Sequence, residues 1–145
     1  MRVLMVVDAA EQSQALLDYV RTARESDAEF VLLAISLSGR SAELQTAQNV
    51  LEEALQTLAE EPGDRFRARL EIGEPAEVIA RVAQEEGASV IMMPAHGDGE
   101  FPRLQELGSV AHAVAHRTNI PILIASPSGL EALLRDERVL TVPAR

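Results

Sequence analysis

Apolar and polar positions along the chain follow two periods, one typical of buried strands and one typical of amphipathic helices. Short, nearly continuous apolar runs occupy residues 2–7, 30–35, 90–93 and 120–125. Between them, apolar residues recur at helical spacing within residues 16–23, 44–58, 78–82 and 110–114. Strands that alternate with helices predict a parallel sheet with helices on both faces, the doubly wound α/β class.

The segment from Phe66 to Ile72 has a different pattern. Apolar residues at positions 66, 68, 70 and 72 alternate with charged residues at 65, 67, 69 and 71. A period of two with charges on one side indicates a half-exposed strand near a sheet edge. The following Gly73-Glu74-Pro75 leads into a helix, for which Pro75 suits the first turn and Gly87 the residue after the C-cap.

Composition narrows the class of protein. The 145 residues suffice for one domain, and with 47% hydrophobic but only 3% aromatic residues the core must be aliphatic. No stretch approaches the roughly 20 apolar residues that cross a bilayer. The net charge of −10 argues against nucleic acids and anionic membranes as partners. The chain has no Cys, as expected of a cytoplasmic protein, and no Lys, which excludes a Walker A loop.

The candidate binding residues follow the ends of predicted strands. Asp8 follows the first strand, Ile35 ends the second, and the loop over residues 94–109 follows the fourth. Ligands of open parallel sheets bind beyond the carboxyl ends of the strands, so these segments are expected to share one cleft. The loop ends in Gly108-Ser109 at the start of a helical pattern, and a helix N-terminus can hold an anion such as phosphate.

Taken in order, several segments resemble the universal stress protein family over residues 2 to 126. They are the strand ending in Asp8, the sequence GEPAEVI at 73–79, His96-Gly97, GSV at 108–110 and NIPILI at 119–124. The resemblance implies a five-stranded sheet in the order 3-2-1-4-5, and a homodimer often formed by pairing the fifth strands. We expect one domain over residues 1–126 and a short C-terminal extension over 127–145 that docks on the domain or on the partner subunit. The dimer is expected to form through the strand Ile120–Ala125, through the tail, or through both.

Nucleotide-binding members of this family carry the motif G-x2-G-x9-G-(S/T). Here Pro94 replaces the first Gly, and ten residues instead of nine separate Gly97 from Gly108. Pro94 has no N–H and cannot donate a backbone hydrogen bond. The resemblance implies that Asp8 faces the adenine edge and Ile35 flanks the base. The phosphates would contact Gly97, Gly108, Ser109 and Val110. The implied ligand is ATP or AMP, with Mg²⁺ only together with the nucleotide.

The sequence leaves alternative functions open. The first is a regulatory stress-response domain that binds a nucleotide, without catalytic residues and with slow hydrolysis at most, because neither a general base nor a Lys is positioned to drive it. The second is a stress protein that binds no nucleotide and acts through dimer or other protein contacts. A nucleotide-hydrolysing or nucleotidyl-transferring enzyme is disfavoured, since residues 8–13 lack its phosphate loops. His112 and His116 have a chelating spacing but no third ligand, so no metal site is predicted.

Overall fold

The fold is an open, all-parallel sheet of five strands in the order β3-β2-β1-β4-β5. This computed structural model describes residues 1–8, 28–58, 65–94 and 109–125. The strands are β1 (Arg2–Val6), β2 (Glu29–Ser36), β3 (Phe66–Ile72), β4 (Val90–Pro94) and β5 (Ile122–Ala125). The order and the parallel direction confirm the predicted α/β sheet.

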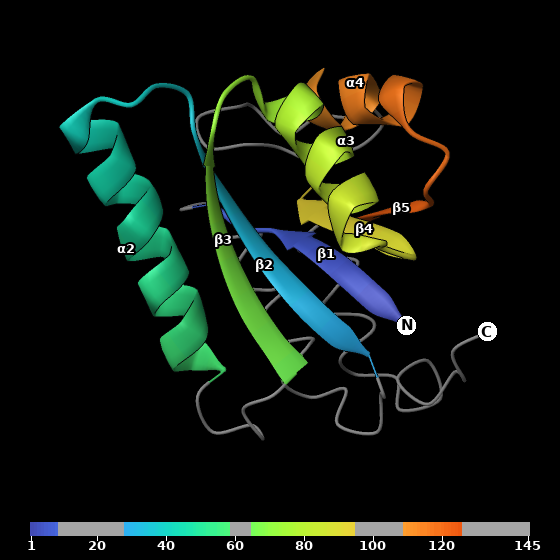
Figure 1. Ribbon diagram of the computed structural model, residues 1–145, viewed down its shortest axis with the longest axis horizontal. Helices are drawn as coiled ribbons and strands as arrows, with labels where there is room; N and C mark the ends of the chain where they lie inside the picture. The colour runs from blue at the N-terminus through green and yellow to red at the C-terminus, as the bar shows by residue number, and fades with distance from the viewer. Residues whose placement is uncertain (9–27, 59–64, 95–108, 126–145) are drawn as a thin grey trace.

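Helices cover both faces of the sheet, as Figure 1 shows. Helix α2 (Ser41–Thr57) lies on one face, and helices α3 (Pro75–Glu86) and α4 (Ser109–Arg117) lie on the other. Each face has its own apolar layer, because successive side chains of a strand point to opposite sides. Met5 and Leu32 belong to the layer beneath α2, whereas Leu4, Leu33 and Ile91 belong to the layer beneath α3 and α4. Burial on both faces explains why the central strands are continuously apolar.

The ends of α3 are set by local chemistry. The Glu74 carboxylate accepts hydrogen bonds from the backbone N–H groups of Ala76 (3.2 Å) and Glu77 (2.8 Å), which lowers the pKa of that carboxyl. Pro75 occupies the first turn, as predicted. Gly87 stands at the C-cap itself in the left-handed conformation, with φ 65° and ψ 38°. A glycine ends the helix here because it adopts that conformation without a Cβ clash.

The predicted start of the last strand is wrong by two residues. The apolar run begins at Ile120, but β5 begins at Ile122. Pro121 lacks an N–H group and cannot donate to the ladder, although its carbonyl accepts a hydrogen bond from the Ile91 N–H at 2.9 Å. The first strand is also shorter than its apolar run, since β1 ends at Val6 while the Val7 N–H still donates to the Leu33 carbonyl at 2.9 Å.

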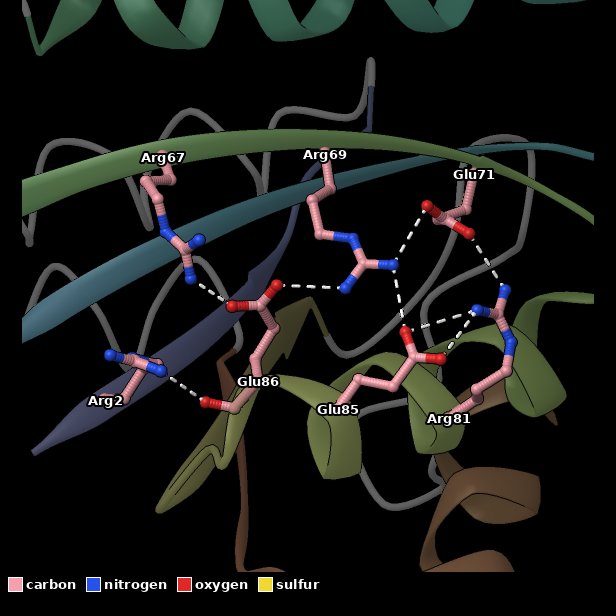
Figure 2. A network of polar contacts seen from close by, with 7 residues as sticks. All are labelled: Arg2, Arg67, Arg69, Glu71, Arg81, Glu85 and Glu86. Atoms are coloured by element: carbon pink, nitrogen blue, oxygen red, sulfur yellow. Dashed lines mark hydrogen bonds and ion pairs between the residues drawn. The ribbon is translucent and has the colours of Figure 1, made fainter.

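Strand β3 forms one edge of the sheet, as its alternating pattern predicts. Its apolar side packs beneath α2, where Phe66 stacks on Phe30 with ring centroids 5.5 Å apart. Its charged side faces α3, and Figure 2 shows that Arg67, Arg69 and Glu71 point toward side chains of that helix. They make ion pairs with acids and one arginine of α3: Arg67 with Glu86; Arg69 with Glu85 and Glu86; Glu71 with Arg81.

This charged network also lowers two carboxyl pKa values. The hydrogen bond from Arg81 lowers the pKa of Glu71, with a further contribution from Arg69. The hydrogen bond from Arg69 lowers the pKa of Glu85, again with help from Arg81. Arg2 extends the network to β1, because its Nη1 donates to the Glu86 carbonyl at 2.7 Å. The edge strand is therefore tied to α3 by charge and to α2 by apolar contact.

Candidate functional site

A cleft of about 320 Å³ opens where β1 and β2 end. Asp8 and Ile35, which the sequence predicts to share a site, both line it, and the Ile35 side chain also packs against the layer beneath α3 and α4. Successive turns of α2 form the opposite wall, with the side chains of Glu43, Thr46, Ala47 and Val50. The cleft lies beyond the carboxyl ends of neighbouring parallel strands, where ligands of such sheets bind. Its volume is at the lower end of the range for small-molecule sites.

The cleft exists because side chains become smaller toward this end of the sheet. On the face of β2 toward α2, the side chains shrink from Phe30 and Leu32 to Ala34 and Ser36. On α2, Ala47 opposes them and is itself buried at 6% exposure. Large side chains close the space between sheet and helix near Phe30 and Leu32, whereas the small ones leave room nearer the strand ends. The cleft thus follows from a few alanine and serine positions.

Hydrogen bonds hold the loop between β2 and α2, which forms one rim of the cleft. The Glu43 carboxylate accepts from the Ser38 backbone N–H at 3.0 Å and from the Ser38 hydroxyl at 2.6 Å. The Ser36 hydroxyl donates to the Ser38 carbonyl, and the Ser36 carbonyl accepts from the Gly73 N–H at 2.9 Å. This rim is therefore fixed both to α2 and to Gly73, between β3 and α3. Sequence reasoning missed Glu43 and Ser38, although an acid in the first turn of a helix is a recognisable signal for such a contact.

The charges in the cleft restrict what it can hold. Asp8 and Glu43 place two carboxylates among its lining side chains, and no Arg or His of the described residues lines it. Carboxylates repel phosphate but accept hydrogen bonds from hydroxyl and amino groups. The cleft therefore suits a neutral, hydrogen-bonding group such as a base or a sugar, and any phosphate must lie outside it.

The other predicted site residues follow β4 in the sequence. Gly97 and Gly108 fall outside the described residues. Helix α4 begins at Ser109, as predicted, and Val110 is half-buried against the layer beneath that helix. Pro94 is the last residue of β4, in register with Ala125 of β5. Because β4 is parallel to β1, Pro94 and Asp8 both lie where the carboxyl ends of the strands meet.

Comparison with known proteins decides the family. The model of the universal stress protein family matches residues 1–126. The chain belongs to this family. YxiE, a universal stress protein of Bacillus subtilis, is 28% identical, over 85% of this chain and 97% of YxiE. The universal stress protein MJ0577 of Methanocaldococcus jannaschii is 23% identical, over 85% of this chain and 93% of that protein.

Solved structures of the family share the fold. The structure of MJ0577 has a TM-score of 0.70 and covers 86% of this chain and 94% of its own. A universal stress protein from Archaeoglobus fulgidus, solved in complex with dAMP, has a TM-score of 0.67 at 20% identity, over 86% of this chain and 96% of its own. At these identities the likeness establishes the five-stranded architecture.

Proposed function

We propose that this universal stress protein is a regulatory domain that binds an adenine nucleotide, ATP or AMP. The base and ribose would occupy the cleft between β1, β2 and α2, with Asp8 accepting hydrogen bonds and Ile35 flanking the base. The observation that carries the proposal is that Asp8 and Ile35, from the ends of neighbouring strands, line one cleft. The dAMP complex of the A. fulgidus relative supports the ligand class.

The phosphates would lie toward the loop after β4 and the start of α4. Backbone N–H groups at the N-terminus of α4 favour an anion, and the sequence places Gly97, Gly108, Ser109 and Val110 there. Pro94 removes one backbone donor from the motif, so the phosphates gain less here than in a chain with Gly at that position. Mg²⁺ would enter only with the nucleotide. We expect a cytoplasmic protein whose hydrolysis, if measured, is slow.

The first experiment identifies a bound ligand. Purified protein is denatured, and released nucleotide is identified by chromatography and mass spectrometry. Calorimetric titration with adenosine, AMP and ATP, each with and without Mg²⁺, then gives the affinities. Binding that is lost in Asp8→Ala, is reduced for ATP but not for adenosine in Gly108→Val, and is retained in Glu52→Ala supports the proposal. Glu52 is a matched control, because it is an exposed acid on α2 that does not line the cleft. No release and no heat at millimolar ATP would refute it.

A second candidate function works through protein contacts alone, and the edge strand β5 favours it. Leu123 of this four-residue strand is 42% exposed, and an open apolar edge invites pairing with a second chain. We propose a homodimer in which two copies of β5 pair. Light scattering on Leu123→Lys is expected to show a monomer, and truncation after Ser128 tests the contribution of the tail. A dimer that both variants leave intact would overturn this assembly.

A further inference from the structure

Two histidines lie one turn apart on the outer side of α4. Ala111 and Val114 of this helix are buried at 1% and 0% exposure, whereas His112 and His116 face solvent. Residues four apart on a helix are neighbours. Here the two Nε2 atoms are 3.2 Å apart, and the rings meet edge to face with centroids 4.7 Å apart. The two ring nitrogens therefore lie close enough together to contact a single ion.

This separation matches the bite of a metal chelate. Metal–nitrogen bonds of 2.0–2.1 Å at tetrahedral or right angles place two donor atoms about 2.9 to 3.4 Å apart. In the structure the two Nε2 atoms face each other at this separation, so a rotation of the rings would direct both lone pairs at one shared ion. Both rings would bind through Nε2, so the ring that carries its proton on Nε2 would carry it on Nδ1 instead. Because the two side chains already lie together, ordering them would add little cost.

We propose that His112 and His116 bind a late divalent transition-metal ion. Neutral imidazoles favour Cu²⁺ most strongly, with Ni²⁺ and Zn²⁺ weaker. No group of three His, Cys, Asp or Glu side chains suited to a metal occurs in the described part of the chain. No metal site is predicted from the sequence, because the sequence shows no third ligand for the pair. The short distance between the two Nε2 atoms favours instead an open two-histidine site whose remaining positions are filled by water.

The surroundings set the affinity. His116 also lines a groove of about 680 Å³ between α3 and α4, together with the charged residues Glu77, Arg81 and Arg117. Arg81 is already paired with Glu71 and Glu85, so Arg117 is the main local charge that opposes a cation. The net charge of −10 acts in the opposite direction. With two ligands, we expect micromolar rather than tighter binding.

The test uses the full chain without an affinity tag. Cu²⁺ is titrated against a chelating dye, and electron paramagnetic resonance counts the nitrogen ligands. We expect one ion per chain with two nitrogen ligands, and a loss of affinity of about tenfold or more in His112→Ala and in His116→Ala, whose exposed side chains can be removed without disturbing the fold. The control His96→Ala, which keeps the pair, should bind as the wild type does.

Two results would overturn the proposal: no binding at a tenfold excess of Cu²⁺ over protein at 100 µM, or binding that neither substitution weakens. The site is independent of the nucleotide proposal. The Asp8→Ala variant is expected to bind Cu²⁺ normally, so failure of one proposal is distinguishable from failure of the other.

Discussion

Glu86 offers the sharpest test of how the edge strand is held. Its side chain is 11% exposed and accepts from both Arg67 and Arg69, the latter at 2.9 Å. Glu86→Gln keeps the shape but removes the charge. A hydrogen bond to a charged group contributes about 1.5–3 kcal/mol. The Arg67 contact is worth less, because Arg67 is 59% exposed and screened by water, so the Arg69 contact carries most of the loss. We expect destabilisation of about 2 kcal/mol, or a drop in Tm of about 4–8 °C.

Urea unfolding followed by circular dichroism measures this loss directly. Glu85→Gln is the matched control: Glu85 is the neighbouring acid of the same helix, contacts Arg69 at 3.0 Å, but is 47% exposed. Its effect is expected to be clearly smaller and to fade in 1 M salt, whereas that of Glu86→Gln persists. The reasoning fails if the Glu86→Gln midpoint equals that of the wild type, or if Glu85→Gln is equally destabilising.

Three further outcomes are expected from the structure. The pKa values of Glu71 and Glu85 are lowered from about 4.5, so their carboxylates stabilise the fold above the unfolded-state pKa, and this stabilisation is lost as the pH falls below about 5. Between pH 7 and 3.5, the urea midpoint should therefore fall less steeply in Arg69→Met than in the wild type. An equal slope in the two proteins would contradict this expectation. Gly87→Ala should lower the free energy of unfolding by about 1 kcal/mol, because residue 87 has a φ of 65°. Gly87→Asn should lower it less, since Asn adopts this conformation more readily, and thermal unfolding measures both variants. Equal destabilisation by the two substitutions would point to another cause. Ala47→Leu should fill the cleft and weaken nucleotide binding at least about tenfold by calorimetry.

The predictable parts of the fold are those that depend on residues close together in the sequence. The alternation over residues 66–72 marked the edge strand, and Pro75 and Gly87 marked the ends of α3, because each acts through its own backbone. The start of β5 was not predictable from hydrophobicity, since Pro121 extends the apolar run but not the ladder. The sheet order came from the family resemblance, as periodicity alone does not state which strands pair.

The cleft was predictable in place but not in shape. Asp8 and Ile35 were expected together because parallel strands end at one edge. The hollow between Ala34 and Ala47 depends on which residues of β2 and α2 oppose each other, and that pairing is tertiary. The ion pairs of Arg67 and Arg69 with Glu86 join residues 19 and 17 positions apart, beyond any local rule. The predicted residues Gly97 and Gly108 stay predictions.

The two halves of the proposed nucleotide site differ in how well this chain preserves them. The cleft for base and ribose has its acid, its apolar flank and a rim fixed by Glu43. The half for phosphate has lost a donor at Pro94 and gained a residue before Gly108. Since Asp8 and Glu43 repel phosphate from the cleft, the phosphates depend entirely on the weakened half. Recognition in this protein should therefore rest on the nucleoside, and the added phosphates of ATP should increase affinity little over adenosine.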